Sequence, residues 1–388
     1  MTKYKVVIIH PSMAPYRVDL FNALDQCFDL KVQFLTENPG YQKYDQEELR
    51  NNLKCDNEVL NSGIDFFGRQ VRWGIMKRIK DFSPDTVITH EFSPTTLGIG
   101  ILKSTLKNPV KQIIWTADNP YMLDNEVFLR KAARQMALRK AEGLIVYSNE
   151  TKELYKARYH FDGPIGVSGN LQNEKSIQDA LMSASDRSIE IANDLSLFEN
   201  KVVLFVGRLS KVKRVDRILM SFEKLVKDAA FEKTVLALIG DGPEKVALQR
   251  MARELGIQEN VLFLEHLSRN ELFAWYRLGA CLVLPSEFEP WGAVVNEALV
   301  AGMPVICSEK AGARELIMND INGSVVDPGN AQVLLSSLKK WCLYSEPLSL
   351  DLLSPTRKSF LKNRFEEAVV GFYNLVQKVA EAKVSIGQ

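Results

Sequence analysis

Histidine and cysteine are scarce in this sequence, and their placement argues against the metal and disulfide centres that they often form. Only 4 of the 388 residues are histidine and 5 are cysteine. The histidines lack metal-ligand spacing, and no two cysteines form a Cys-x-x-Cys pair. We therefore expect neither a zinc site nor a disulfide framework, and the cysteine usage fits a reducing compartment.

Long apolar runs and an excess of one charge are also missing. No stretch approaches the roughly 18 consecutive apolar residues of a membrane-spanning helix. The apolar run at residues 6–9 is too short for the core of a signal peptide. Because the net charge is only +1, no overall field directs the chain to nucleic acid. We expect a cytoplasmic protein, with peripheral attachment to the inner face of the cytoplasmic membrane as an alternative.

The sequence is rich instead in alternating strand-like and helix-like segments. A chain of 388 residues favours two domains, and both halves show this alternation. The pattern predicts two doubly wound, Rossmann-like α/β domains facing each other across a cleft, with mostly parallel sheets. We place them at residues 1–180 and 197–363, joined by a polar connection at 169–196. A helix in 364–388 could pack back on either domain.

Two cations follow the first apolar run of the second half. Arg208 and Lys213 come directly after the strand-like segment 202–207. Ligands of such sheets bind at the carboxyl ends of strands, and arginine with lysine suits a phosphate group there. The alternative is that both residues face water, as loop cations usually do. Lys211 and Arg214 lie beside them, and spacing alone does not choose among the four.

A Gly-x-Gly-Pro turn follows the next strand-like run. Gly240 and Gly242 in LIGDGPE permit unusual backbone angles. A plain strand-to-helix turn is the favoured interpretation, because a lone Gly-x-Gly is weak evidence for a phosphate loop.

The segment SEFEPWGAVVNEAL, residues 286–299, places two carboxylates around the expected start of a helix at 291–293. Gly292 lets the backbone approach a ligand, and the first free amides of the helix favour an anion. Alone, Glu289 and Glu297 read as solvated surface residues. Together with Arg208 and Lys213, they describe a pocket for a diphosphate and for sugar hydroxyls, which is a nucleotide-sugar site.

Over roughly residues 202–328 the chain resembles the family 4 glycosyltransferases, which have the GT-B fold. The resemblance rests on the order and spacing of FVGRLSKVKR, LIGDGPE, the segment from VLFLEH to AGARELI, and NGSVVDP. The first half resembles the family more loosely, through APYRVDLFNAL. The family implies a retaining transfer of a sugar from a nucleotide donor, without a cofactor or a catalytic metal. We expect a hexose from UDP-glucose, with GDP donors as an alternative.

The resemblance also assigns donor-binding roles. Arg208 and Lys213 match the residues that bind the diphosphate, Glu289 the one that contacts the transferred sugar, and Glu297 the one that binds the ribose. The remaining donor contacts are implied for the loop that holds Trp291, Gly292 and Ala293, and for the base-binding loop around His266. Backbone amides near Met13 and Ala14 could approach the phosphates from the first domain.

Three positions depart from the family pattern. Arg214 stands where glycine is usual, so the entry into the following helix could differ. Trp291 replaces phenylalanine and could reshape the sugar pocket. Ala117-Asp118 replaces a histidine that faces acceptor and sugar. Asp118 could take over that place as a hydrogen-bond partner or acceptor-side base, or it could cap the following turn.

The first domain offers further acceptor-side candidates. His90 and Glu91 end a strand-like run and form a weaker pair. Arg17 could point into the cleft or lie on the surface. The loop at residues 10–17 lacks the glycine-rich signature of a dinucleotide fold, which argues against a dehydrogenase.

Two basic stretches of the first half, residues 69–80 and 128–140, could dock on an anionic membrane or be ordinary solvated surfaces. Because the family often acts on lipid acceptors, we expect a hydroxyl acceptor such as a lipid or a cell-envelope glycan precursor. The alternative functions are a nucleotide-sugar epimerase of GT-B fold and a non-catalytic UDP-sugar-binding protein.

Overall fold

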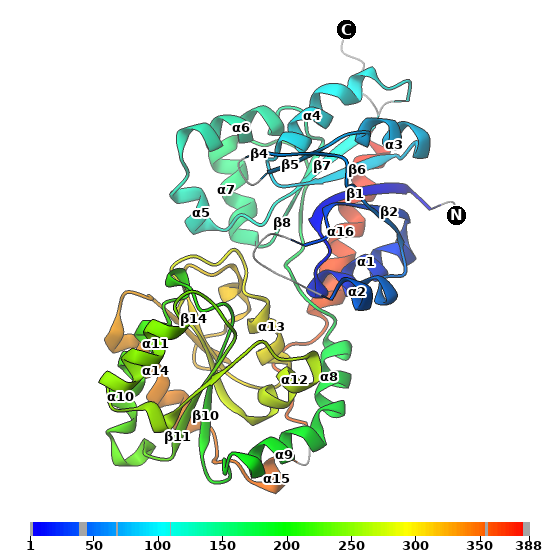
Figure 1. Cartoon of the computed structure of the whole chain (residues 1–388). Helices are drawn as coiled ribbons and strands as arrows, with labels where there is room; N and C mark the ends of the chain where they lie inside the picture. Colours follow the sequence, from blue (N-terminus) through cyan, green and yellow to red (C-terminus); the bar gives the residue numbers. More distant parts are fainter. Residues whose placement is uncertain (1–2, 39–44, 67–68, 109, 354–355, 383–388) are drawn as a thin grey trace. The chain divides into compact units, whose positions relative to one another are not determined.

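The computed structural model describes residues 3–38, 45–66, 69–108, 110–353 and 356–382 (Figure 1). The chain divides into two compact units, which we call the first and second domains. The first comprises Met1–Leu171 and Phe365–Gln388, and the second comprises Gln172–Arg364.

The first domain is built on a parallel sheet of seven strands in the order β3-β2-β1-β6-β7-β8-β9. Its central strands are continuous apolar runs, which is the pattern of a sheet covered on both faces. The strands are β1 (Lys5–Ser12), β2 (Asp29–Thr36), β3 (Asp56–Val59), β6 (Thr86–His90), β7 (Lys111–Trp115), β8 (Gly143–Val146) and β9 (Ile165–Val167). The helices are α1 (Pro15–Cys27), α2 (Gln46–Asn52), α3 (Ile75–Phe82), α4 (Pro94–Leu102), α5 (Pro120–Asp124), α6 (Phe128–Leu138) and α7 (Asn149–Tyr159).

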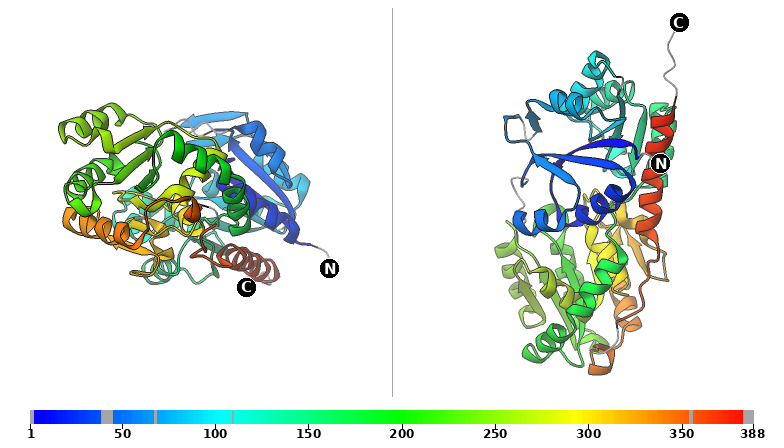
Figure 2. Two further views of the ribbon diagram at one scale, coloured as in Figure 1. Left: turned by 90° about the horizontal axis from the view of Figure 1, so that it is seen from below. Right: turned by 90° about the vertical axis from the view of Figure 1, so that its right-hand side faces the viewer.

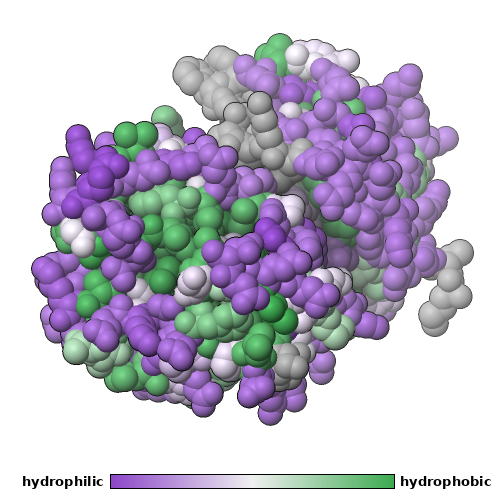
Figure 3. Space-filling view, turned by 60° about the horizontal axis from the view of Figure 1, so that its bottom comes forward, coloured by the Kyte–Doolittle hydropathy of each residue, from purple (hydrophilic) through white to green (hydrophobic). Residues whose placement is uncertain are grey.

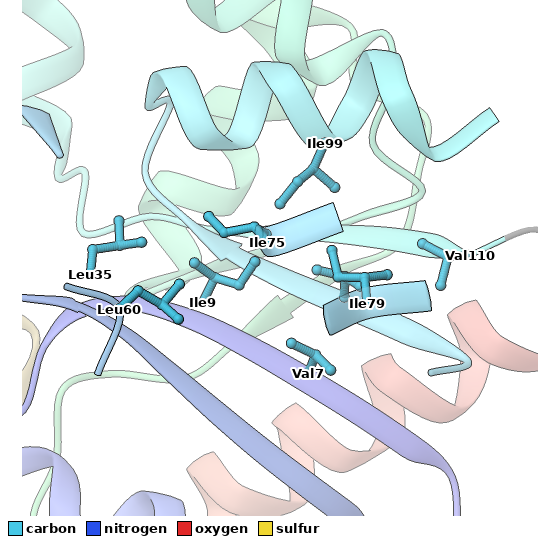
Figure 4. Packing of buried hydrophobic residues seen from close by; sticks show 9 residues of the cluster. Val7, Ile9, Leu35, Leu60, Ile75, Ile79, Ile99 and Val110 are labelled. Atoms are coloured by element: carbon cyan, nitrogen blue, oxygen red, sulfur yellow. The ribbon is translucent and has the colours of Figure 1, made fainter. Parts of the chain in front are cut away.

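Residues 69–80, for which the sequence left open a membrane-docking stretch or a solvated surface, do not form one continuous element. They split into β5 (Arg69–Arg72), which pairs with β4 (Gly63–Phe66) in a hairpin, and the start of α3. Ile75 and Ile79 of α3 point into the core beside Val7 and Ile9 of β1 (Figure 4). The apolar residues of α3 pack against the sheet, and they are therefore not available for contact with a membrane.

The C-terminal helix α16 (Arg364–Glu381) packs in the first domain (Figure 2, red). Phe372 lies edge-on to Trp115 with ring centroids 5.5 Å apart, and Tyr373 stacks on Phe28 at 5.5 Å. A Cβ atom at Gly143 would stand 2.9 Å from Val379 Cγ2, so the small residue in β8 lets the helix approach the sheet.

The second domain contains a parallel sheet of six strands in the order β12-β11-β10-β13-β14-β15. The strands are β10 (Lys201–Val206), β11 (Thr234–Ile239), β12 (Val261–Leu264), β13 (Gly279–Leu284), β14 (Val305–Ser308) and β15 (Gly323–Val326). The helices of eight or more residues are α8 (Glu174–Ser183), α9 (Ser185–Asp194), α10 (Val215–Val226), α11 (Lys245–Glu254), α12 (Arg269–Leu278), α13 (Ala293–Val300) and α14 (Ala331–Tyr344). Alternating strands and helices in both domains agree with the predicted Rossmann-like pattern.

The chain passes from the first domain to the second between Leu171 and Gln172, inside the predicted connection at 169–196, but this stretch is not a linker over its whole length. Most of it forms α8 and α9, which belong to the second domain and pack against α12. Ile177, Leu181 and Ile191 are buried there at helical spacing. The lack of large aromatic side chains misled the prediction, because aliphatic residues suffice to bury these helices.

The face drawn in Figure 3 is mostly hydrophilic, with hydrophobic areas between the polar ones. In the second domain, the exposed apolar side chains include Leu343 and Tyr344 at the end of α14. Among the described helices, none combines the length and the apolarity needed to cross a bilayer.

Candidate functional site

Each of the two parallel sheets has one point, the topological switch point, at which the chain changes the side of the sheet to which it adds strands. In the second domain this point lies between β10 and β13, because β11 and β12 extend the sheet on one side and β14 and β15 on the other. Loops that leave such a switch point diverge, and the crevice between them is the usual ligand site of doubly wound sheets. The loops after β10 and β13 carry Arg208, Lys213, Glu289 and Gly292, so topology brings the predicted donor residues to one edge.

Lys213 and Glu289 form an ion pair across this switch point. The Lys213 Nζ donates to Glu289 Oε2, and the two side chains are 19% and 12% exposed. The loops also bond directly, since the Glu287 amide donates to the Val212 carbonyl at 2.7 Å. A cation and a carboxylate are thus held together at the carboxyl ends of adjacent strands.

The Gly-x-Gly turn after β11 allows the loop after β10 to pack closely on it. A Cβ atom at Gly240 would stand 2.1 Å from the Gly207 carbonyl oxygen, and one at Gly242 would stand 2.3 Å from that of Leu209. The Leu209 amide donates to the Asp241 carbonyl at 2.9 Å. The turn is therefore more than a plain connection, because its glycines position the loop that carries Lys213.

Gly292 is the N-cap of helix α13 and has a left-handed conformation, with φ 99° and no side-chain cap. This agrees with the predicted helix start. The preceding loop is braced by residues after β14, because the Gly312 amide donates to the Glu289 carbonyl at 3.2 Å. Trp291 is 4% exposed and packs beside Gly312, and Ala293 is the first residue of the helix.

Glu297 lies inside α13, and its carboxylate is already oriented by two donors. The Tyr276 hydroxyl donates to Oε2 and the Gln172 Nε2 donates to Oε1, each at 2.6 Å. Burial raises the pKa of the Glu297 carboxyl, while these two hydrogen bonds act in the opposite direction. Sequence patterns did not indicate Tyr276 or Gln172, because each lies in another helix or loop far along the chain.

A second ionic cluster, also missed from the sequence, surrounds Glu287. Its carboxylate accepts from Lys310 at 2.6 Å and from Arg214 at 3.0 Å, and Arg217 lies 3.2 Å away. The pKa of Glu287 is lowered mainly by the Lys310 ammonium and to a smaller extent by the charges of the two arginines. Arg214 also has the left-handed φ of 53° that explains the usual glycine at this position.

The remaining donor candidates, Arg208 and His266, lie in loops at the same edge of the sheet. Arg208 is exposed, and its carbonyl accepts from the Ser210 amide at 3.0 Å within the loop after β10. His266 is exposed in the loop after β12. Their predicted roles toward the diphosphate and the base stay predictions.

In the first domain, Asp118 is fully buried and bound on several sides. Its Oδ2 accepts from Arg134 at 2.7 Å, from Tyr155 at 2.6 Å and from Thr116 at 2.8 Å. It does not cap the following turn, since the Asn119 side chain accepts from the Met122 amide and begins α5. The cap interpretation is therefore wrong, and the acceptor-side role stays a prediction for a carboxylate that is 0% exposed.

His90 is the last residue of β6, and Glu91 follows it at the carboxyl end of the strand. Glu91 has a left-handed φ of 57°, and its Oε1 accepts from the Ala117 amide at 2.8 Å. Burial, assisted by the charge of Asp118, raises the pKa of Glu91 to about 7. The His90 ring lies edge-on to that of His10, with centroids 4.7 Å apart. A strained carboxylate with a raised pKa is typical of functional sites.

The loop after β1 holds Met13 and Ala14, which are 1% and 2% exposed. Ala14 precedes α1 and supplies no side-chain cap. Arg17, which the sequence left unassigned, is 3% exposed in the first turn of this helix. Among the described residues, no group of three or more His, Cys, Asp and Glu side chains is arranged to hold a metal ion.

Comparisons with known proteins concern the second domain and the overall fold. Residues 188–351 match the family described as glycosyl transferases group 1. An uncharacterized glycosyltransferase of Methanocaldococcus jannaschii is 28% identical over 256 residues, which cover 64% of this chain and 61% of the relative. The D-inositol 3-phosphate glycosyltransferase 2 of Catenulispora acidiphila is 33% identical over 148 residues, which cover 35% of this chain and 34% of the relative. HepE of Anabaena, solved in complex with UDP, has a TM-score of 0.70 at 18% identity, covering 97% of this chain and 98% of that one.

The two sequence alignments span only 61% and 34% of the relatives' lengths. The structural likeness extends over nearly the whole chain and confirms the predicted fold class. The Lys213–Glu289 pair and Glu297 lie within the matched residues. The chain thus has the GT-B fold of glycosyltransferases, and its residues 188–351 match the glycosyl transferases group 1 family.

Proposed function

We propose that this chain is a retaining glycosyltransferase that moves a hexose from UDP-glucose to a hydroxyl acceptor. The observation that carries the proposal is the Lys213–Glu289 pair at the switch point of a domain matching glycosyl transferases group 1. HepE, which shares the fold, has been solved with UDP and with UDP-glucose, and this supports the choice of donor.

The donor would lie along the carboxyl edge of the second sheet. Lys213, Arg208 and the first amides of α13 offer positive charge to the diphosphate. Glu297, held by Tyr276 and Gln172, offers a carboxylate to the ribose hydroxyls. Glu289 would share its carboxylate between Lys213 and a hydroxyl of the transferred sugar.

Transfer would depend on stabilising the departing diphosphate. As the bond to the sugar breaks, negative charge grows on the phosphate oxygens that face Lys213 and Arg208. Fixed donors at such a place are usually the largest single source of catalysis. The acceptor hydroxyl would attack from the face of the leaving group and pass its proton to the leaving phosphate. These cations supply the charge stabilisation that a metal provides elsewhere, so the proposed reaction requires no metal.

The acceptor class that we propose is a lipid or a cell-envelope glycan precursor, reached by peripheral contact with an anionic membrane. The support comes from the N-terminus of α6, where Val127, Phe128 and Leu129 are 67%, 80% and 78% exposed. Exposed Lys131 and Arg139 follow them. Exposed apolar residues beside basic ones suit an anionic bilayer surface.

Arg134, also in the 128–140 stretch, is buried against Asp118 and takes no part in such a surface. Arg78 and Trp73 in 69–80 offer a smaller contribution, since Arg78 pairs with Glu58.

A binding screen followed by a transfer assay tests the proposal. UDP and UDP-glucose should raise the melting temperature of the full chain, and GDP-sugars should raise it less, because a ligand that binds only the native state stabilises it. UDP-glucose should then be converted to UDP in the presence of a lipid or soluble acceptor, with no change on adding EDTA. NMR of the first-formed product should show an α linkage.

Three outcomes contradict parts of the proposal separately. Consumption of the donor without any acceptor, with a new sugar epimer, identifies an epimerase. Binding of UDP without transfer to any acceptor indicates a binding protein. A β linkage in the first-formed product overturns the retaining mechanism.

A further inference from the structure

The first domain has its own switch point, between β1 and β6, and the described residues there include a buried arginine. The sheet order β3-β2-β1-β6-β7-β8-β9 reverses at this place. Arg17, in the first turn of α1, is 3% exposed. Its guanidinium lies 4.3 Å from the ring centroid of Trp115, at the end of β7. The Arg17 Nη2 donates to the Tyr147 hydroxyl, just after β8.

The charge of Arg17 has no acidic partner among the residues that the structure describes. No carboxylate lies within ion-pair distance of its guanidinium, and its Nε and Nη1 atoms have no hydrogen-bond partner there. Guanidinium carries five N–H donors in a rigid fork that matches phosphate and carboxylate oxygens. At least two donor atoms of this fork are therefore uncommitted.

Such an arrangement is unfavourable for the folded domain by itself. Burying a charge without an opposite charge is strongly unfavourable, and the cation–π contact with Trp115 offsets only part of that cost. Buried polar groups without partners are rare and often mark functional sites. An anion is the kind of group that would compensate this charge.

The neighbouring side chains add further uncommitted polar atoms. Trp115 Nε1, which can only donate, has no partner in the described structure, and neither has His10 Nε2. The His10 Nδ1 lies 2.8 Å from the Ser12 carbonyl, so Nδ1 carries the proton and Nε2 presents a lone pair. Burial lowers the pKa of His10 to about 3, in keeping with a neutral ring. The group thus combines donors with one acceptor, which suits an anionic group that stands next to a hydroxyl.

We propose that Arg17, with Trp115 and His10, forms an anion subsite of the acceptor site, so that the acceptor carries a phosphate or a carboxylate beside its hydroxyls. This inference rests on the proposed glycosyltransferase function, in which the second domain holds the diphosphate of the donor. The uncommitted nitrogens are covered in this structure, so binding requires a local movement of the side chains above them.

The test is isothermal titration of the full chain with inorganic phosphate and, separately, with acetate. The variants are Arg17→Gln, which removes the charge, and Arg17→Lys, which keeps the charge but loses the fork. Arg50→Gln, which removes an exposed arginine of the same domain, is the matched control. Because phosphate can also bind at the donor site, the titrations are repeated with UDP present, and UDP is titrated by itself into each variant.

We expect the titrations to show phosphate or acetate binding that persists in the presence of UDP. Arg17→Gln should abolish it, and Arg17→Lys should weaken it roughly tenfold or more, the size of one lost charge-assisted hydrogen bond. Arg50→Gln should leave it unchanged, and all variants should bind UDP as the wild type does, which also shows that they are folded. The anion that binds more tightly identifies the acceptor group as phosphate or carboxylate.

Three results overturn the proposal. Equal anion binding by Arg17→Gln and wild type removes Arg17 from the site. Absence of any Arg17-dependent binding by either anion removes the site itself. Loss of UDP binding in a folded Arg17→Gln variant assigns the arginine to the donor instead. Failure of every form to bind UDP, with Arg17-dependent phosphate binding intact, counts against the proposed function and leaves the anion site standing.

Discussion

Glu91 and Asp118 compete for a single hydroxyl proton, that of Thr116. The Thr116 Oγ1 lies 3.1 Å from Glu91 Oε2 and 2.8 Å from Asp118 Oδ2, and it accepts from the Asp118 amide at 3.2 Å. A hydroxyl donates only one hydrogen bond. A proton on Glu91 Oε2 would donate to Thr116 and leave Thr116 free to donate to Asp118. The geometry therefore favours protonated Glu91, in agreement with its raised pKa of about 7.

Glu91→Gln should match the wild type at low pH and exceed its stability at high pH. The introduced side-chain amide can donate to Thr116 while its oxygen accepts from the Ala117 amide, as protonated Glu91 does. Because the folded pKa is raised from 4.5 to about 7, the contribution of Glu91 to stability is present below pH 4.5 and is lost as the pH rises through 7. Urea unfolding at pH 5 and pH 8 measures this difference.

The matched control for that experiment is Glu153→Gln, which removes an exposed carboxylate of α7 that is 67% exposed. It should show the same dependence of stability on pH as the wild type. If Glu91→Gln also keeps the wild-type dependence, Glu91 does not change its protonation state in this range.

Arg214→Gly should be more stable than Arg214→Ala by about 1 kcal/mol, because alanine retains the cost of the left-handed φ and glycine does not. Both variants lose the same ion pairs with Asp216 and Glu287, so these losses cancel in the comparison. Urea unfolding of the two variants gives the difference directly. Equal stabilities would show that the backbone at Arg214 carries no strain.

Gly240→Ala should destabilise the second domain far more than Gly256→Ala. Both glycines have positive φ, at 137° and 71°, so both substitutions strain the backbone. At Gly256 no atom stands within 4 Å of a new Cβ, whereas at Gly240 the Gly207 carbonyl oxygen stands at 2.1 Å. Gly240→Ala should also weaken UDP binding, because the loop that carries Lys213 must move. Similar melting temperatures for the two variants would refute the close approach.

Phe128→Ser with Leu129→Ser should reduce binding of the full chain to vesicles containing anionic lipid, since each exposed apolar residue that enters the interface adds to the binding energy. Val246→Ser, which removes a side chain 76% exposed in the second domain, is the control. Co-sedimentation with anionic and with neutral vesicles measures the effect. Equal binding by the double variant and the control removes α6 from the membrane contact.

The architecture could be predicted from the sequence wherever the burial of an element produces a recognisable pattern of apolar residues. Strands such as β10 and β13 are covered on both faces, so they read as continuous apolar runs, and their ends locate the loops that hold Lys213 and Glu289. Helices α8 and α9 were not predicted, because each buries only one stripe of aliphatic side chains. The short strands β3 and β9 are only partly buried and lack a clear apolar run.

The parts of the site that could not be predicted depend on contacts between distant residues. Glu287 meets Arg214 from 73 positions away, and Gln172 reaches Glu297 across 125. The hydrophobic periodicity of a sequence carries no information about contacts between residues so far apart. Asp118 illustrates the same limit, because only the folded domain shows that Arg134 and Tyr155 surround it. In the sequence, Arg17 likewise cannot be distinguished from an ordinary surface arginine of a helix. Only the folded domain shows its contact with the Trp115 ring.

Lys213→Ala should lower the turnover of UDP-glucose roughly 100- to 1,000-fold, the usual loss when one fixed donor to a developing negative charge is removed. Lys211→Ala is the matched control, because Lys211 is an exposed lysine in the same short turn. It should stay near the wild-type rate if only the position facing Glu289 stabilises the leaving diphosphate. Lys213→Ala removes the ammonium that pairs with Glu289, so thermal melts must show that the variant is folded before its rate is interpreted. Equal rates for the two folded variants would remove Lys213 from the reaction and would leave its pairing with Glu289 as a purely structural link between the loops after β10 and β13.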